Sequence, residues 1–394
     1  MTNAPQASPI PLSVPEIKGR EWEYVKECLD TGWVSSVGPF VDRFEREFAQ
    51  ALGAPHAVAV ASGTAALHLA LLVAGVRPGD LVIAPTLTFV ASINAIRYVG
   101  ADPILVDAEP DHWLLDPQLV TRLLEDDCER DGDEVRHRAT GRRVAAIMPV
   151  DLLGHPCDYG QLRPLADRFA IPIVEDATEG LGARVGEHSI GSQADLACYS
   201  FNGNKLITTG GGGMLVTADA DWARRARHLS TQAKADPVEY VHDDVGFNYR
   251  MTNVQAAIGC AQLERLDEFV ATKRRIAERY DAAFASIPGI LPQGEAPGVT
   301  SAIWLYTIRV DAARFGRDAR GLMAQLAGRG IQSRPLFQPL HLGPIYRYAP
   351  RAGGAVAERL WDEGLSLPCS VGLAPADQDR VISAVREAAG ADVH

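Results

Sequence analysis

The chain has 394 residues, of which 47% are hydrophobic and 22% charged, and its formal net charge is -12. A chain of this length can bury one large hydrophobic core and support a smaller attached domain. The acidic balance leaves no basic surface for phosphodiesters or anionic lipids, so we expect neither nucleic acid nor a membrane surface as a partner. No stretch reaches the roughly 18 uninterrupted apolar residues of a membrane-spanning helix.

The cysteines and the N-terminal segment bear on the cellular compartment. Six cysteines are scattered through the chain without paired spacing, which favours reduced thiols over a disulfide framework. Residues 1–15 have neither a positively charged start nor an apolar run, so they do not have the pattern of a secretory signal. We therefore predict a cytoplasmic protein.

Short runs rich in valine and isoleucine alternate with helical patterns from about residue 54 to residue 216. This alternation is typical of an α/β domain whose mostly parallel sheet is covered by helices. Helices are predicted between the strands, for example over 64–72 and 159–169. The predicted strands are 56–61, 81–85, 103–107, 144–149, 171–176, 195–201 and 213–217.

Two later segments complete the predicted architecture. The polar stretch 125–143 interrupts the alternation and is predicted to be a surface loop. A long helical pattern over 253–287 ends at a Pro-Gly pair, which is a plausible domain boundary. We predict a large domain over residues 1–270 and a small C-terminal α+β domain over 271–394.

Ligands of open parallel sheets bind beyond the carboxyl ends of the strands, so residues that directly follow strands are the first functional candidates. Ser62, Gly63 and Thr64 follow the first predicted strand and open a helical run. Their amides and hydroxyls at a helix N-terminus could bind a phosphate. The alternative is an ordinary N-cap, which favours serine and threonine for backbone reasons alone.

Two more side chains follow predicted strands. Asp176 ends the run IPIVEDA, where a carboxylate could pair with a protonated heterocyclic nitrogen or hold a metal. The alternative is a capping aspartate at the end of a strand. Phe89 could stack on a planar ring, although an aromatic side chain in this place is usually core packing.

Lys205 lies in a polar, glycine-bounded loop between two predicted strands. The glycines at 210–213 permit close backbone approach, and a lysine in a desolvated or cationic setting can form a Schiff base. The alternative is a solvated loop lysine. The glycines precede a strand instead of opening a helix, so they are not the dinucleotide fingerprint and a nicotinamide site is disfavoured.

Together these candidates fit one cofactor. A phosphate cradle, a stacking aromatic ring, a carboxylate and a loop lysine are what pyridoxal phosphate (PLP) requires. The residues lie in longer motifs, which are ASGTAALHLAL, APTLTFVASINAI, IVEDATEGLGA, YSFNGNKLITTGGGGM and GFNYRMTNVQAAIGCAQLERL. Read jointly, these motifs resemble the DegT/DnrJ/StrS family of PLP-dependent sugar aminotransferases, which implies the fold type I of aspartate aminotransferase.

The resemblance implies a role for each matching residue. Lys205 would bind the cofactor as a Schiff base and then move protons as base and acid, and Asp176 would pair with the pyridine nitrogen. The other implied cofactor contacts are Ser62, Gly63, Thr64 and Ser200 around the phosphate, Phe89 stacked on the ring, Glu179 near its phenolic oxygen, and Asn248 at the phosphate of a second subunit. A homodimer with shared active sites follows from the resemblance.

The substrate is also implied by resemblance, which is greatest to the LegC-type branch. That branch aminates C4 of a nucleotide-linked 4-keto-6-deoxy-N-acetylhexosamine, and the expected amino donor is glutamate in a two-step exchange at one site. The nucleotide, UDP, GDP or dTDP, is left open. Candidate sugar-nucleotide contacts, each of which could equally be structural, are Trp33, Ser35, Tyr240, His242, Trp304, Arg334 and His341.

Two positions depart from the family pattern. Many relatives have histidine where this chain has Asp151 and an acidic residue where it has Gly211, and the aspartate is either a harmless change or a change in specificity. The nearby residues His155, Cys157 and Asp158 lie too close together on one loop to converge on a metal, so no metal site is predicted.

Three other functions are weighed against aminotransfer. A PLP-dependent sugar dehydratase or lyase of the same fold is disfavoured, because family dehydratases typically replace the lysine with histidine, whereas Lys205 is present. A catalytically silent regulator would share the fold and is distinguished by cofactor absorbance and turnover. A nicotinamide oxidoreductase would need the glycine fingerprint that the sequence lacks.

Overall fold

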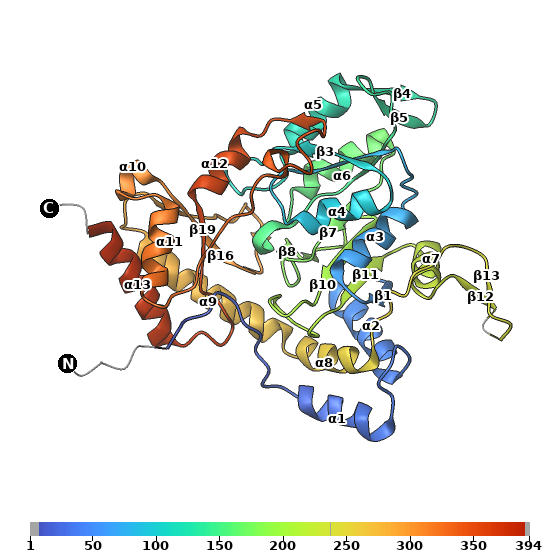
Figure 1. Ribbon diagram of the computed structural model, residues 1–394, viewed down its shortest axis with the longest axis horizontal. Helices are drawn as coiled ribbons and strands as arrows, with labels where there is room; N and C mark the ends of the chain where they lie inside the picture. Colours follow the sequence, from blue (N-terminus) through green and yellow to red (C-terminus); the bar gives the residue numbers. More distant parts are fainter. Residues whose placement is uncertain (1–7, 237, 391–394) are drawn as a thin grey trace.

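The computed structural model describes residues 8–236 and 238–390 and is built around one central sheet (Figure 1). Two groups of four strands make up this sheet, in the orders β1-β11-β10-β7 and β18-β3-β2-β6. The strands are β1 His56–Val60, β2 Leu81–Pro85, β3 Asp102–Val106, β6 Val144–Ile147, β7 Val174–Asp176, β10 Leu196–Ser200, β11 Gly213–Thr217 and β18 Arg351–Ala352.

Two isolated bridges join the groups. Ile147 pairs with Ile173 and Val150 pairs with Asp176, both in parallel register. All strand pairs of the sheet are parallel except those of β11, which runs antiparallel between β1 and β10. The predicted mostly parallel α/β sheet is therefore confirmed, and each of the seven predicted strands is present.

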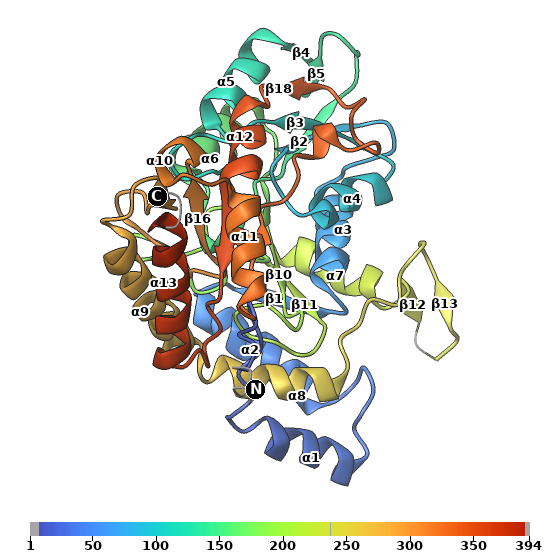
Figure 2. The ribbon, with the colours of Figure 1, turned by 60° about the vertical axis from the view of Figure 1, so that its left-hand side comes forward.

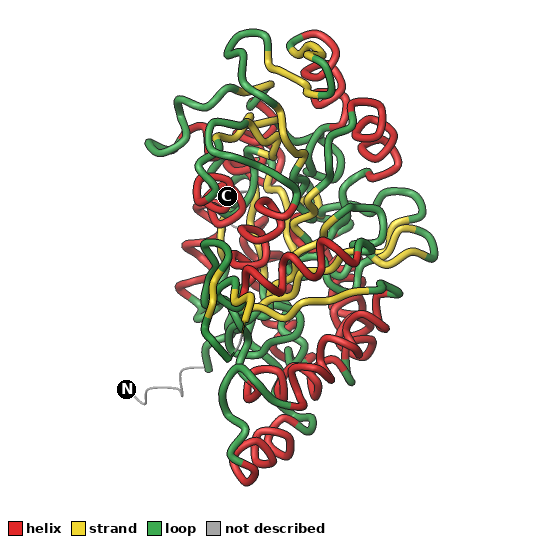
Figure 3. The backbone as a smooth tube through the Cα atoms, turned by 90° about the vertical axis from the view of Figure 1, so that its right-hand side faces the viewer, coloured by secondary structure: helices red, strands yellow, loops and turns green. Residues whose placement is uncertain are grey.

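Side-chain alternation along β1 explains why helices cover both faces of the sheet. Val58 and Val60 pack into one apolar cluster with helix α3, whereas Ala57 and Ala59 pack into another with helix α2. Figure 3 shows the strands in the interior with helices outside them. The helices around the sheet are α2 Pro39–Leu52, α3 Gly63–Val73, α4 Val90–Tyr98, α5 Pro117–Asp126, α6 Tyr159–Phe169, α7 Ala220–Ser230 and α8 Asn253–Leu263.

A second sheet lies beside the first, where Figure 1 labels β16 and β19, and has the order β14-β16-β19-β17 with antiparallel pairs. Its side chains and those of α9, α11 and α13 form a separate buried cluster, which includes Ile308, Leu322 and Val385. Helix α9 runs through position 270, and the domain boundary there stays a prediction. These elements are β14 Ile290–Pro292, β16 Tyr306–Val310, β17 Arg334–Pro335, β19 Gly364–Leu367, α9 Leu266–Phe284, α11 Ala319–Gly328 and α13 Pro375–Gly390.

The remaining elements are short or peripheral. A hairpin of β12 and β13 projects away from the body (Figures 1 and 2). Within residues 8–236 and 238–390, no helix is both long and apolar enough to cross a bilayer. These elements are α1 Glu21–Thr31, α10 Ala312–Phe315, α12 Ala355–Glu363, the 3₁₀ turns Leu152–Gly154 and Leu340–Leu342, and the strands β4 Cys128–Asp131, β5 Glu134–His137, β8 Arg184–Val185, β9 His188–Ser189, β12 Lys234–Asp236, β13 Val241–His242 and β15 Val299–Thr300.

Two sequence predictions need correction. The segment 125–143, predicted to be a surface loop, contains the antiparallel pair β4 and β5, because Cys128 and Val135 turn inward and are buried. The single helix predicted over 253–287 is two helices, since α8 ends at Leu263 and α9 begins at Leu266. The continuous helical periodicity of the sequence conceals this change of direction.

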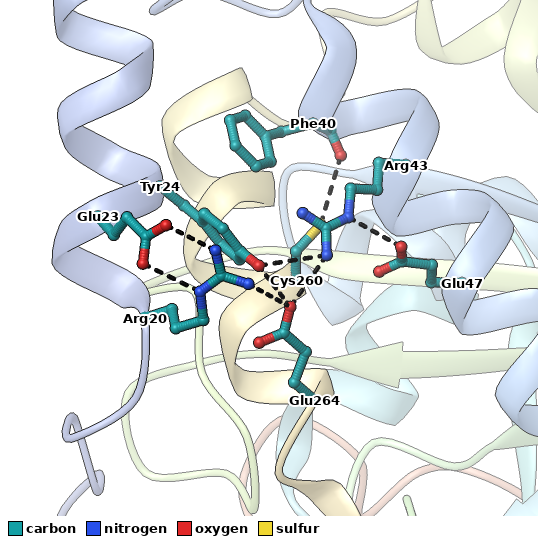
Figure 4. A network of polar contacts seen from close by, with 8 residues as sticks. All are labelled: Arg20, Glu23, Tyr24, Phe40, Arg43, Glu47, Cys260 and Glu264. Atoms are coloured by element: carbon teal, nitrogen blue, oxygen red, sulfur yellow. Dashed lines mark hydrogen bonds and ion pairs between the residues drawn. The ribbon is translucent and has the colours of Figure 1, made fainter.

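Helices α1 and α2 are held to the end of α8 by a polar network (Figure 4). The Tyr24 hydroxyl donates to Glu264 Oε1 at 2.5 Å, and Arg43 Nη2 donates to the same oxygen at 2.9 Å. At the start of α8, the side-chain amide of Asn253 donates to the Trp33 carbonyl at 2.8 Å. These contacts fix the connection between α1 and α2, which carries two of the predicted sugar contacts.

Candidate active site

A pocket of about 300 Å³ lies at the carboxyl ends of the central strands, and Trp304 and Phe337, which flank strands of the second sheet, also line it. It is the place where ligands of open parallel sheets bind. Most of the cofactor contacts predicted from the sequence converge on it. The predicted residues that line the pocket are Ser62, Gly63, Thr64, Phe89, Asp176, Glu179, Ser200, Lys205 and Trp304.

The N-terminus of α3 forms one wall of the pocket. Ser62 caps this helix, since its Oγ accepts from the Ala65 amide at 3.0 Å, so the N-cap interpretation is correct and leaves the helix end facing the pocket. A Cβ on Gly63 would lie 2.7 Å from Ser200 Cβ. Glycine is therefore needed for the close approach of α3 to β10, which leaves main-chain amides available to an anion.

The glycine run before β11 serves the same close packing. Gly212 has φ +147°, which side chains rarely adopt, and a Cβ on Gly213 would lie 2.5 Å from the main chain of Ser62. Gln255 Nε2 holds the loop by donating to the Gly211 carbonyl at 2.7 Å. The run thus brings β11 against the capped end of α3.

Asp176 presents its carboxylate to the pocket from the end of β7 and is only 1% exposed. Its Oδ2 accepts from Ser92 Oγ at 2.6 Å, and its Oδ1 accepts from the Thr178 amide at 3.1 Å. Both donors are neutral groups that orient the carboxylate, and among residues 8–236 and 238–390 no cationic side chain forms an ion pair with it. It can therefore accept a further hydrogen bond from a positively charged group in the pocket.

Lys205 approaches the pocket from the loop after β10. Its Nζ lies 3.5 Å from Glu179 Oε1 and 3.9 Å from the centroid of the Trp304 ring. Trp304 is held at both ends. Its indole Nε1 donates to the Asn204 carbonyl at 2.8 Å, and its main-chain carbonyl accepts from the buried amine of Lys273 at 2.9 Å. The amine is thus held between a carboxylate and an aromatic face.

Glu179 is the second carboxylate of the pocket. Burial raises its pKa, and the neighbouring Lys205 amine opposes that rise. Its Oε2 accepts from the Leu153 amide at 2.8 Å. Leu153 itself has φ +61°, so the 3₁₀ turn after β6 is strained to direct this amide at the carboxylate.

The pocket residues fit the predicted cofactor. An amine, a carboxylate held by neutral donors, and a helix N-terminus left open by glycines match the aldehyde, ring nitrogen and phosphate of PLP. Phe89 is 54% exposed at the rim, where its ring lies 5.6 Å from the Phe337 ring. Its face is therefore free to contact a planar ring.

Other predicted contacts lie outside this pocket. Tyr240 and His242 belong to the projecting hairpin of β12 and β13, and Asn248 lies at its base, where its main chain is bridged to Thr231; all three are exposed. Trp33 and Ser35 lie between α1 and α2. All five are exposed and do not line this pocket, so their contacts with a ligand stay predictions.

Two predicted sugar contacts have structural neighbours. Arg334 is exposed and donates from Nη1 to the Ser333 carbonyl. His341 is 5% exposed, with Nδ1 2.7 Å from Thr86 Oγ1 and Nε2 3.0 Å from the Glu358 carboxylate. Contacts of these residues with a substrate remain predictions.

Several pocket residues were not predicted from the sequence. Ser92 is the most informative, because it orients Asp176 from one helical turn after Phe89. The sequence did contain a signal for Ser92, because it is a polar residue in the first turn of a helix that begins at the ligand-binding edge of the sheet. The other unpredicted polar residues of the lining are Thr88, Thr178, Asn202 and Asn204.

Comparisons with known proteins agree with this site. The family model described as the DegT/DnrJ/EryC1/StrS aminotransferase family matches residues 15–386. A GDP-perosamine synthase of Caulobacter vibrioides is 41% identical over 388 residues, which are 98% of this chain and 99% of the relative.

Solved structures give the same answer. The aminotransferase TlmJ of Streptoalloteichus hindustanus superposes with a TM-score of 0.88 at 31% identity, covering 97% of this chain and 99% of TlmJ. S. venezuelae DesV, solved with a ketimine intermediate, has a TM-score of 0.86 at 34% identity with the same coverage. The chain therefore belongs to the DegT/DnrJ/EryC1/StrS aminotransferase family, which confirms the predicted enzyme class, fold type and PLP cofactor.

Proposed function

We propose that this enzyme transfers an amino group from an amino acid, glutamate being the expected donor, to the C4 keto group of a nucleotide-linked 4-keto-6-deoxy sugar. The observation that carries the proposal is the convergence of Lys205, Asp176 and the open end of α3 on one pocket in a chain of this family. Of the nucleotides left open by the sequence, GDP is favoured by the GDP-perosamine synthase relative.

The pocket residues divide the work of binding and proton transfer. The N-terminus of α3 with Thr64 and Ser200 would hold the cofactor phosphate, and Asp176 would keep the ring nitrogen protonated. When bound, PLP supplies a ring that accepts the electrons left when a proton is removed from a substrate carbon. Lys205 would remove that proton and return it to a different carbon as general base and acid.

Glu179 and Trp304 would control the free amine of Lys205. The Glu179 carboxylate lies 3.5 Å from the Lys205 amine and can balance the positive charge of the amine when the amine is protonated. The indole face stabilises the same charged form and, at 4% exposure, excludes water from one side of it. These residues would therefore hold Lys205 within the pocket between successive proton transfers.

We further propose that the active enzyme is a homodimer in which Asn248 of one chain reaches the cofactor phosphate of the other. Exposed apolar side chains on the projecting segment support this, since Val238 is 78% exposed and Tyr240 is 70% exposed. Large apolar side chains exposed together on a protrusion are typical of a surface that is buried against another protein chain. The predicted sugar contacts on the same segment would then face the partner's pocket.

A half-reaction assay tests the substrate. Enzyme converted to its pyridoxamine form by glutamate is mixed with GDP-, UDP- and dTDP-linked 4-keto-6-deoxy sugars, each with and without a 2-acetamido group. Return of the cofactor's aldehyde-form absorbance with a GDP-linked sugar is the expected result. Equal rates with all nucleotides would remove the preference for GDP, and no return with any sugar would overturn the substrate class.

Reduction with borohydride tests the cofactor attachment separately. Peptide mapping after reduction is expected to find the cofactor on Lys205. Labelling of a different lysine would overturn the role of Lys205 without bearing on the sugar. A dehydratase of the same fold would release no amino sugar in the half-reaction, so product analysis distinguishes the two activities.

A further inference from the structure

Two carboxyl groups lie directly behind the pocket and have no part in the proposed chemistry. Asp151 follows β6 and Glu175 lies on β7, next to Asp176, and both side chains are 0% exposed. The main chains of the two segments are joined, because the Asp151 amide donates to the Asp176 carbonyl at 3.1 Å and the Asp176 amide donates to the Pro149 carbonyl at 2.9 Å. The two carboxyl groups are thus fully buried between adjacent strands.

The hydrogen bonds of the pair leave one oxygen of each group unused. Asp151 Oδ1 accepts from the Cys157 amide at 2.9 Å and from the Tyr159 hydroxyl at 3.1 Å. Glu175 Oε1 accepts from the Gly191 amide at 2.9 Å. No N–H or O–H group among the described residues donates to Asp151 Oδ2 or to Glu175 Oε2.

Val150 pairs with Asp176 in parallel register, so Asp151 and Glu175 lie on adjacent strands and project toward the same face of the sheet, where each perturbs the pKa of the other. In the part of the chain that the structure describes, no lysine, arginine or histidine forms an ion pair with either. Two ionised carboxylates in contact without a cation would be strongly destabilising in a buried site. A single proton between the two unused oxygens satisfies both of them and removes one charge.

We propose that Asp151 and Glu175 share one proton at neutral pH and that this protonated pair is a positioning device for the two carboxylates of the active site. The pair ties the turn after β6 to β7. That turn supplies the Leu153 amide to Glu179, and β7 carries Asp176. Loss of the proton would place two like charges in contact and push the turn and the strand apart.

The surroundings of the pair are neutral or acidic, so no neighbour can replace the proton. Burial raises the pKa of Tyr159 and of Tyr199, which keeps both hydroxyls protonated as donors, and it raises the pKa of the Cys157 and Cys198 thiols. The titratable groups that face the pair, from the turn after β6, α6, β7 and β10, are Cys157, Tyr159, Asp176, Cys198 and Tyr199.

The sign of the pH dependence follows from the pKa directions. Burial raises the pKa of Asp151 and of Glu175 in the folded protein, and repulsion from Asp151 raises that of Glu175 further, whereas the interaction with Glu175 opposes the rise at Asp151. The stability that the shared proton contributes is therefore complete below the unfolded carboxyl pKa of about 4 and is lost as the pH rises through the folded pKa. One extra proton in the folded state changes the folding equilibrium constant by about tenfold per pH unit over that range.

The first test uses the apo-protein and does not depend on the substrate or on catalysis. Urea unfolding is measured from pH 5 to pH 8.5 for the wild type, Glu175→Gln and Asp151→Asn. Each amide replaces the shared proton with an N–H donor, so the stability of each variant is expected to rise relative to the wild type as the pH rises. Curves parallel to that of the wild type would overturn the shared proton, and the exposed Glu187→Gln is the control for loss of a surface charge.

The second test addresses positioning, which rests on the proposed role of Asp176. Cofactor affinity is measured by fluorescence titration of the apo-forms of Glu175→Gln and Glu175→Leu. The glutamine variant is expected to bind PLP within about threefold of the wild type, whereas the leucine variant, which has similar volume but no donor, weakens binding by about tenfold or more. Equal affinity of the two variants would overturn the positioning role.

Infrared spectroscopy gives a readout of the proton that remains available if the leucine variant does not fold. The carbonyl band of a protonated carboxyl group is expected in the wild type at pH 8 and is expected to be missing from Glu175→Gln and from Asp151→Asn. A band that persists in both variants, or that is missing from the wild type, would overturn the proposal. Failure of the sugar assay above would leave all three results unaffected.

Discussion

The pocket and the projecting segment of β12 and β13 are built in opposite ways. In the pocket, Asp176 is 1% exposed and each of its oxygens has a donor from the same chain. On the projecting segment, Tyr240 is 70% exposed, and Asn248 at its base is on the surface. The donors that orient Asp176 come from its own chain, whereas the projecting segment presents side chains that have few neighbours of their own. We therefore expect substitutions in the pocket to affect chemistry and cofactor binding, and those on the projecting segment to act across two subunits.

The largest effect is expected from Lys205→Ala. Removal of the amine abolishes both the covalent bond to the cofactor and the proton transfers, so kcat should fall by about 10⁴-fold or more. Steady-state kinetics with glutamate and the keto sugar measure it. Lys18→Ala, at a lysine that is 71% exposed, is the control and should leave kcat unchanged; a similar loss in both variants would contradict the assignment.

Asp176→Asn tests the carboxylate with little change in shape. The amide cannot stabilise a protonated ring nitrogen, so kcat is expected to fall by about 10²-fold or more while the fold remains. Rapid-scan absorbance of the cofactor during the glutamate half-reaction measures the step. Asp167→Asn, at a side chain that is 66% exposed, should behave like the wild type. Unchanged kinetics at Asp176 would place the ring elsewhere in the pocket.

Mixing two inactive variants tests whether the projecting segment serves a second subunit. Asn248→Asp introduces a charge that repels the cofactor phosphate, so alone it should have little activity, as should Lys205→Ala. After unfolding and joint refolding, half of the dimers are mixed and each contains one intact site, so activity should return to about a quarter of the wild-type value. No recovery, despite mixed dimers visible by native mass spectrometry, would show that Asn248 acts within its own chain.

Gly63→Ala probes the close approach of α3 to β10. The added Cβ would lie 2.7 Å from Ser200 Cβ, so the free energy of unfolding should fall by about 1–3 kcal/mol through overpacking, and PLP affinity should fall with it. Urea unfolding and cofactor titration measure the two effects. Gly294→Ala is the matched control, because a Cβ there meets no atom within 4 Å. Equal unfolding free energies and equal PLP affinities of the two variants would mean that α3 can move to accommodate the added Cβ without a loss of stability or of cofactor binding.

The smallest effect is expected outside both regions, at the network that holds α1 and α2 to α8. Tyr24→Phe removes the hydroxyl that donates to Glu264, which should lower the free energy of unfolding by about 1 kcal/mol. Tyr98→Phe, at a tyrosine that is 55% exposed, should cost nothing measurable in the same urea series. A change in kcat at Tyr24 would mean that the network also controls the pocket.

The local residue pattern was enough to predict the sheet and many of the residues that line the pocket. Seven strands follow from β-branched runs bounded by turns, and ligands of such sheets bind where strands end, so Lys205, Asp176 and Ser62 could be selected from their positions alone. The family motifs then joined these residues to one cofactor.

Only the tertiary structure decided which groups act together. Ser92 orients Asp176 across 84 positions of the chain, and Trp304 lies against Lys205 from the far side of the pocket. The partnership of Asp151 with Glu175 and the burial of Cys128 and Val135 in the hairpin of β4 and β5 were equally invisible, because the sequence records spacing along the chain. Distances across the core are set only when the helices and sheets pack together. Those distances decide whether a carboxyl group is ionised, is protonated or forms a hydrogen bond with a neighbouring group.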